Sequence, residues 1–288
     1  MDLLNVDGMA ASVRTYGAGE PIVALHATAS SGDQWQSLAL AMPGGFQVLA
    51  PEFYGHGSTS PWPGQRAFTL SEDVEIASAV VRRQAWPVHL VGHSYGGAVA
   101  LRVALEQPER VRSLTLIEPV AMHLLKLGDA RDRRLYVEVD QLAADMAGGV
   151  LTGHYQDAMR CFIDYWNGEG AWWRSSESRR ESLGRMAGST LLHFIAVAGE
   201  LTSLAAYRRI RVPTLLLRGR QTRKSTERVT ELLARNIRGA SSVVVEGAGH
   251  MLPLTHPELV NAAVSGHILE YSARDQRPGE RPQHASAA

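Results

Sequence analysis

The sequence predicts an α/β fold: a mostly parallel, twisted sheet with helices on both faces. The first observation is a set of short apolar runs that alternate with helix-like segments. The second is that these runs are almost continuously apolar, as expected for strands buried on both faces. The strand-like runs are residues 11–16, 21–26, 46–50, 88–91, 113–118, 212–217 and 242–246.

The helix-like segments follow these runs in order along the chain. Between the first two strands, residues 17–20 supply turn-forming glycines. Acidic Glu72 and Asp73 stand in the first turn of the segment 70–84, where negative charge favours the helix dipole. The helix-like segments are residues 30–42, 70–84, 98–107 and 257–271.

Strand signals vanish between about residues 119 and 211, where helix-like, charge-rich segments take over. We therefore expect one α/β domain, made of residues 1–119 and 211–272, with a helical insertion at 120–210. The tail, residues 273–288, is rich in Arg, Pro, Gln and Ser and is expected to be disordered.

Composition narrows the function classes. The 288 residues include 29 basic and 29 acidic side chains, so the charge balance favours neither a nucleic-acid partner nor an acidic tail. One cysteine, Cys161, excludes an intramolecular disulfide and a thiol-rich metal site. Neither a signal peptide nor a membrane span is expected from the hydrophobic pattern, which favours a cytoplasmic protein.

The most informative motif is Gly92-His93-Ser94-Tyr95-Gly96, which follows the apolar strand that starts at Val88 and precedes a helix-compatible stretch. A sharp strand-to-helix turn of this kind exposes the serine oxygen, and the flanking glycines give it room. The pattern predicts a nucleophilic serine at Ser94. The alternative is a tight turn whose serine only caps the helix.

A serine nucleophile needs a base, for which the chain offers eleven histidines. His250 is the preferred candidate because a buried-type strand and a glycine-flexed loop deliver it to the carboxyl end of the sheet. His93 is expected to be packed beside the serine. His26 and His56 also stand on loops at the sheet edge, but no glycine-flexed strand exit brings them to Ser94.

From residue 11 to residue 271 the chain resembles the α/β-hydrolase superfamily, because several spaced motifs occur in that family's order. They are His26-Ala27-Thr28-Ala29-Ser30, Gly55-His56-Gly57-Ser58, the Ser94 motif and Gly247-Ala248-Gly249-His250. The resemblance implies an α/β-hydrolase fold in which the insertion forms a cap. It also implies an oxyanion hole made by the backbone N–H groups of Thr28 and Tyr95.

The resemblance leaves the acid of the triad open. The family usually carries an aspartate just after the strand 214–217, where this chain has Thr222. Some members, haloalkane dehalogenases among them, carry the acid after the preceding strand, and Glu118 stands there. A carboxylate that closes a buried strand is costly unless it is paired, which favours His250 as its partner. The alternative is a structural or substrate-binding Glu118.

The predicted function is hydrolysis of a carboxylic ester or related acyl bond by a Ser94–His250–Glu118 triad through an acyl-enzyme. A small apolar acyl or aryl substrate is expected, with Met122, His123 and Trp166 as candidate contacts, and neither a metal nor a cofactor is expected. Carbon–carbon bond hydrolysis, cofactor-free haloperoxidase chemistry and acyl transfer remain alternatives on the same triad. A non-catalytic small-molecule binding protein is the alternative from another class.

Overall fold

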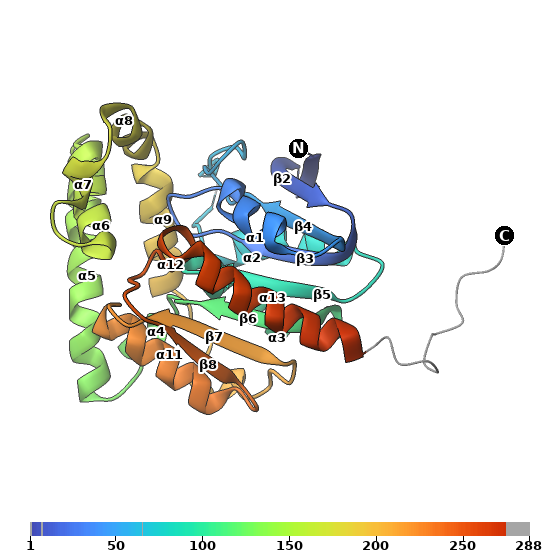
Figure 1. Ribbon diagram of the computed structural model, residues 1–288. Helices are drawn as coiled ribbons and strands as arrows, with labels where there is room; N and C mark the ends of the chain where they lie inside the picture. Colours follow the sequence, from blue (N-terminus) through green and yellow to red (C-terminus); the bar gives the residue numbers. More distant parts are fainter. Residues whose placement is uncertain (1, 7, 65, 275–288) are drawn as a thin grey trace.

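The computed structural model describes residues 2–6, 8–64 and 66–274, and an eight-stranded sheet forms its centre (Figure 1). The tail predicted to be disordered lies outside the described residues, apart from its first two residues at the end of helix α13. The strands are β1 (Asp2–Val6), β2 (Met9–Gly17), β3 (Gly19–Leu25), β4 (Gly45–Pro51), β5 (Val88–His93), β6 (Val111–Ile117), β7 (Thr214–Gly219) and β8 (Ser241–Val245).

The strand order is β1-β2-β4-β3-β5-β6-β7-β8. Strand β2 pairs antiparallel with both β1 and β4. All pairs from β4·β3 to β7·β8 are parallel. The prediction of a mostly parallel α/β sheet is therefore confirmed. Strand β1 was not expected from the sequence, and it extends the antiparallel edge beside β2.

Helices cover both faces of the sheet, because alternate side chains of each buried strand point to opposite sides. In β3, Ile22 and Ala24 pack with one cluster, whereas Val23 and Leu25 pack with the other. Helices α1 (Gln36–Ala41) and α13 (Pro257–Arg274) cover the first face; α2 (Leu70–Arg82), α3 (Tyr95–Glu106) and α11 (Lys224–Asn236) cover the second.

The helix expected over residues 30–42 is shorter and begins differently. A 3₁₀ turn, η1 (Gly32–Trp35), precedes α1, and the Ser31 hydroxyl accepts a hydrogen bond from the Asp33 N–H at 3.4 Å. Ser31 thus caps the turn, and Trp35 and Leu38 anchor the segment in the core, where each is about 1 % exposed. A further 3₁₀ turn, η2 (Pro108–Arg110), leads from α3 to β6.

The segment between β6 and β7 is helical and stands beyond one end of the strands (Figure 1). We call residues 120–210 the cap. Its helices are α4 (His123–Lys126), α5 (Ala130–Leu151), α6 (Tyr155–Asn167), α7 (Ala171–Arg174), α8 (Glu177–Arg185), α9 (Ala187–Ala198) and α10 (Leu204–Tyr207).

Side chains of the α11 region fasten the cap to the core. Arg228 forms an ion pair with Asp132 of α5 at 2.7 Å, and both side chains are largely buried. The Arg223 guanidinium lies 4.2 Å from the centroid of the Tyr165 ring and donates to the Tyr165 carbonyl at 2.9 Å. These contacts fix α5 and α6 over the carboxyl ends of the strands. Among the helices described, none has the length and apolar character to cross a membrane.

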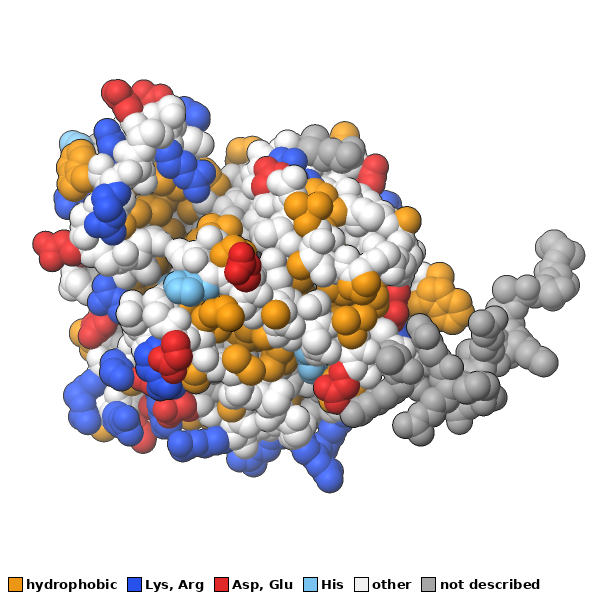
Figure 2. All heavy atoms as spheres, viewed as in Figure 1, with side chains coloured by type: hydrophobic (Ala, Val, Ile, Leu, Met, Phe, Trp, Pro, Cys, Tyr) orange, Lys and Arg blue, Asp and Glu red, His pale blue; other side chains and the backbone are white. Residues whose placement is uncertain are grey.

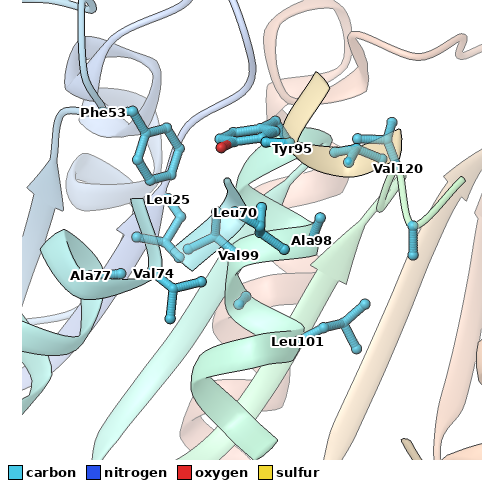
Figure 3. Close-up of a cluster of buried hydrophobic side chains, with 14 of the residues drawn as sticks. Leu25, Phe53, Leu70, Val74, Ala77, Tyr95, Ala98, Val99, Leu101 and Val120 are labelled. Atoms are coloured by element: carbon cyan, nitrogen blue, oxygen red, sulfur yellow. The ribbon is translucent and has the colours of Figure 1, made fainter. Parts of the chain in front are cut away.

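The face covered by α2 and α3 carries the larger apolar cluster (Figure 3). Leu25, Val74 and Val99 meet between the sheet and these two helices, and each is at most 3 % exposed. Tyr95, the first residue of α3, lies above this cluster with its hydroxyl oxygen toward Phe53 (Figure 3). The start of α3 is thus held firmly by packing.

Candidate active site

Ser94 occupies the sharp turn between β5 and α3. Its backbone has φ +56°, in the left-handed region, and its N–H donates to the Ile117 carbonyl at 2.9 Å. Two neighbouring glycines permit the close packing of this turn: a Cβ on Gly92 would collide with the carbonyl of Gly96, and one on Gly96 with the carbonyl of Leu25. The strain of a non-glycine residue at positive φ is concentrated at the serine itself.

Sheet register brings Ser94 and Glu118 to the same edge. His93 of β5 pairs with Ile117 of β6, so Ser94 and Glu118 each follow a paired position on neighbouring parallel strands. His250 reaches this edge from the loop after β8. The loop is held by a hydrogen bond from the Gln221 N–H to the Ala248 carbonyl at 2.8 Å.

The three side chains form a continuous chain of hydrogen bonds. Ser94 Oγ lies 2.9 Å from His250 Nε2, and His250 Nδ1 lies 3.0 Å from Glu118 Oε2. Because a carboxylate accepts and does not donate, Nδ1 carries the ring proton and Nε2 accepts the serine hydroxyl. The carboxylate is fully buried, and His250 and Ser94 are 3 % and 6 % exposed.

Hydrogen bonds surround the Glu118 carboxylate. Oε1 accepts from the Gly219 N–H at 2.7 Å, and Oε2 accepts from the Thr222 hydroxyl as well as from His250. Donors of this kind offset the cost of burying a charge. The Glu118 backbone has φ +47°, so strain accompanies both ends of the Ser94–His250–Glu118 chain.

Among the described residues, two backbone N–H groups beside Ser94 have no protein acceptor. Within the described residues, the Thr28 N–H donates no hydrogen bond, and the Tyr95 N–H, at the first position of α3, has no intrahelical acceptor. Thr28 stands in a turn whose next residue, Ala29, has φ +58°. Both residues line the same pocket as Ser94, so their N–H groups are available to a ligand oxygen there.

His250 is held from two further sides. The Trp166 ring of α6 stacks on the imidazole, with 4.0 Å between the ring centroids and 27° between the planes. His93 Nε2 donates to the His250 carbonyl at 2.9 Å. Burial lowers the pKa of His93 to about 3, so this ring is neutral and serves as a donor to backbone.

Two pockets meet at Ser94. One is small, largely apolar and extends under the cap between Val120, Phe162, Phe194 and Val197. The other is larger and opens between α7, α8 and the His250 loop. In the space-filling view, a hollow with apolar side chains at its floor separates this part of the cap from the core (Figure 2).

The structure brings together most of the residues singled out from the sequence. Ser94, Thr28, Tyr95, Met122 and Trp166 all line the first pocket. His123 stands elsewhere: it is buried, its Nε2 lies 3.3 Å from the Tyr207 hydroxyl, and it is not among the described residues that line either pocket. The expectation that His123 contacts substrate is therefore not supported by its position.

His26 and His56 bind backbone groups and stand apart from Ser94. His26 Nε2 accepts from the Phe53 N–H at 3.2 Å, and His56 Nε2 accepts from the Ala29 N–H at 3.1 Å. Burial lowers the pKa of each ring, so both are neutral. Sequence reasoning missed His193 of α9, which reaches the pocket beside Thr28, because nothing in its helical context distinguishes it from a core histidine.

Comparison with known proteins places this geometry in a family. A profile of the alpha/beta hydrolase family matches residues 22–263. The pimeloyl-[acyl-carrier protein] methyl ester esterase of Aeromonas hydrophila is 27 % identical over 263 residues, which cover 87 % of this chain and 96 % of the esterase. Lipase LipV of Mycobacterium tuberculosis is 32 % identical over 145 residues, but the match spans 48 % of this chain and only 54 % of the lipase.

The fold comparison agrees. An esterase from Exiguobacterium antarcticum superimposes with a TM-score of 0.75 at 19 % identity, covering 92 % of this chain and 98 % of the esterase. At 19 % identity, the similarity to this esterase shows the fold alone. The names of the relatives found by sequence state different reactions. Because the family profile spans most of the chain and the mostly parallel sheet agrees with it, the protein belongs to the alpha/beta hydrolase family.

Proposed function

We propose that this protein is a serine hydrolase that cleaves a carboxylic ester or a closely related acyl bond through an acyl-enzyme. The observation that carries the proposal is the unbroken chain from Ser94 Oγ to His250 at 2.9 Å and from His250 to Glu118 at 3.0 Å. An acyl-transfer nucleophile needs this arrangement of hydroxyl, base and orienting carboxylate.

Each residue has a defined task in the proposed reaction. His250 Nε2 takes the proton of Ser94 Oγ as the oxygen attacks the ester carbonyl, and the same proton then goes to the leaving alkoxide. Glu118 keeps the Nδ1 tautomer and stabilises the imidazolium that forms between the two steps. Water, deprotonated by His250, then attacks the acyl carbon. The bond from that carbon to Ser94 Oγ breaks, Oγ takes the proton back from His250, and the carboxylic acid is released.

The oxyanion is assigned to the backbone N–H groups of Thr28 and Tyr95. Negative charge develops on the carbonyl oxygen in the transition state, where donors already in place stabilise it without reorganisation. The N-terminus of α3 adds its partial positive charge at the same point.

The substrate assigned to this site carries an apolar acyl or aryl group. Phe162, Phe194 and Val197 offer an apolar wall to an acyl or aryl group attached to the carbonyl carbon. The larger pocket on the other side of Ser94 is open enough for the leaving group and for water to enter.

A fluorophosphonate probe and a series of p-nitrophenyl esters test the proposal together. We expect the probe to label Ser94, identified by peptide mass spectrometry, and ester turnover to depend on acyl length. The S94A variant should lose both labelling and turnover. Labelling without ester turnover, combined with cleavage of a vinylogous diketone, would replace ester hydrolysis by carbon–carbon bond hydrolysis. An unlabelled Ser94 would favour a binding protein.

A further inference from the structure

A second buried chain of polar groups runs beside Ser94 and begins in the cap. His193 of α9 is 2 % exposed, and its Nδ1 lies 2.9 Å from the Thr28 hydroxyl. Its Nε2 lies 3.3 Å from Asp73 Oδ2, a close electrostatic contact without hydrogen-bond alignment. Asp73 belongs to α2 of the core, so His193 connects the cap, the core and the loop after β3.

The surroundings define the protonation of this ring. Burial lowers the pKa of His193 well below that of a free histidine, so the imidazole is neutral. Asp73 accepts hydrogen bonds from the Tyr95 hydroxyl at 2.9 Å and the Tyr54 N–H at 3.1 Å. A carboxylate oxygen beside Nε2 places the single ring proton there. Nδ1 is then an acceptor, and the Thr28 hydroxyl donates to it.

Aromatic stacking fixes the position of the His193 ring. It lies parallel to the Tyr95 ring with 3.6 Å between centroids and 3° between planes, and His56 stacks on it at 4.6 Å and 11°. Phe53 meets it edge-on, and Figure 3 shows Phe53 beside Tyr95 above the core. The acceptor atom offered to Thr28 therefore has little freedom to move.

The loop that receives this hydrogen bond is strained and is held by side chains. Ala29 has φ +58°, a conformation that costs free energy in a residue with a Cβ. Gln34 accepts from the Ala27 N–H at 3.2 Å and His56 from the Ala29 N–H at 3.1 Å. These contacts hold the residues on either side of Thr28, and His193 holds Thr28 itself.

We propose that His193 is a positioning residue: by accepting the Thr28 hydroxyl, it fixes the backbone of the oxyanion loop and couples docking of the cap to transition-state stabilisation. This inference rests on the proposed function only in requiring Ser94 as the nucleophile. It assigns to a cap histidine a part in the reaction without contact with the reacting atoms.

Two amide replacements of His193 separate its hydrogen bond to Thr28 from the packing of its ring. Asparagine places a polar atom near the position of Nδ1, and glutamine near that of Nε2, so H193N retains an acceptor for Thr28 whereas H193Q does not. Both variants lose the same stacked ring and form a matched pair. We expect kcat for a p-nitrophenyl ester to be about tenfold lower in H193Q than in H193N, with similar KM, because one neutral hydrogen bond is worth about that factor.

The T28V variant removes the hydroxyl and leaves the ring stack intact. We expect T28V to lose about tenfold in kcat while its melting temperature falls by only a few degrees, because one buried acceptor loses its donor. H193Q/T28V should be no slower than T28V. Equal rates in H193N and H193Q, wild-type rates in T28V, or losses that multiply in the double variant would each overturn the inference. T28V tests the hydrogen bond between Thr28 and His193 even if the His193 variants fold poorly.

The rate of Ser94 phosphonylation by a fluorophosphonate supplies a readout that does not need an ester substrate. Its phosphoryl oxygen occupies the same oxyanion site, so the labelling rates should follow the order given for kcat. If the wild-type protein is labelled but hydrolyses no ester, the proposed function fails and the labelling rates still test His193. A wild-type Ser94 that the probe does not label would overturn the inference together with its nucleophile.

Discussion

Thr222 donates a hydrogen bond to Glu118 Oε2, the same carboxylate oxygen that faces His250 Nδ1. Thr222 occupies the position where the family resemblance predicts an aspartate. It is thus adjacent to Glu118, the carboxylate that we propose as the acid, which follows β6 instead of β7. Gly219, the last residue of β7, donates its N–H to Oε1, so the end of β7 and the loop after it together bind the carboxylate.

The first prediction concerns the charge of Glu118. The E118Q variant should fold normally yet lose about 10³- to 10⁴-fold in kcat, because a neutral amide neither stabilises the imidazolium nor enforces the required tautomer of His250. Initial rates with a p-nitrophenyl ester and the melting temperature measure the two effects. Turnover within a few-fold of wild type would contradict the assignment of Glu118 as the acid.

The second prediction moves the acid to the adjacent position. In E118A the imidazole has no carboxylate partner, and E118A/T222D returns one from the neighbouring loop. Since the Thr222 oxygen already lies within hydrogen-bonding reach of Glu118 Oε2, we expect the double variant to regain at least about tenfold in kcat over E118A. T222D alone is the matched control and should be slower than wild type, because two carboxylates would then share one site.

No gain in E118A/T222D would show that an aspartate at 222 does not reach His250. The register of β6 would then determine the position of the acid.

The third prediction concerns Trp166, which stacks on His250 at 4.0 Å. An indole face stabilises a cation by about 0.5 to 2 kcal/mol, and the proposed reaction passes through an imidazolium at His250. W166L should therefore lower kcat by about 3- to 30-fold for the smallest ester substrates. The kcat of W166F should lie between those of the wild type and W166L. The comparison of kcat and KM along the acyl series is the measurement. A change confined to KM would identify Trp166 as a wall of the pocket alone.

Local sequence was enough to predict the sheet core and the position of Ser94. Buried strands such as 88–91 and 113–118 are apolar throughout, and the glycines around Ser94 have few other uses, so their pattern identifies both. The carboxylate partner of His250 was harder to predict from the sequence. Glu118 follows from strand order and register, which bring the ends of β5 and β6 together, and a linear pattern only suggests such pairing.

Cap contacts were the least predictable part of the site. Phe162 lies in an amphipathic helix and His193 in a largely apolar one, where apolar and aromatic residues pack equally well against other cap helices or over a pocket. Their final neighbours depend on how the cap docks on the core, which is a property of tertiary structure. His123 illustrates the same limit: it begins α4 directly after Met122, yet it packs against Tyr207 while Met122 lines the pocket.

The last prediction concerns acid stability. Burial lowers the pKa of His123 from about 6.5 to about 4, so the folded protein excludes a proton that the unfolded chain binds in this range. The contribution of the neutral His123 ring to the free energy of unfolding is therefore complete above about pH 6.5 and is lost as the pH falls toward about 4. His93, lowered by burial to about 3, acts in the same direction. Asp73, raised by burial to about 6, acts in the opposite direction between about pH 4 and 6.

The variant H123Q isolates one of these groups, because glutamine retains a polar atom near the Tyr207 hydroxyl and does not titrate. Urea unfolding at about pH 6.5, 5.5 and 4.5 should show a free energy of unfolding that falls less steeply in H123Q than in wild type. The expected difference is at most about 1.4 kcal/mol per pH unit, the value for one whole proton. Parallel lines for the two proteins would mean that His123 is as protonated in the folded state as in the unfolded one. They would rule out its burial as a source of acid lability.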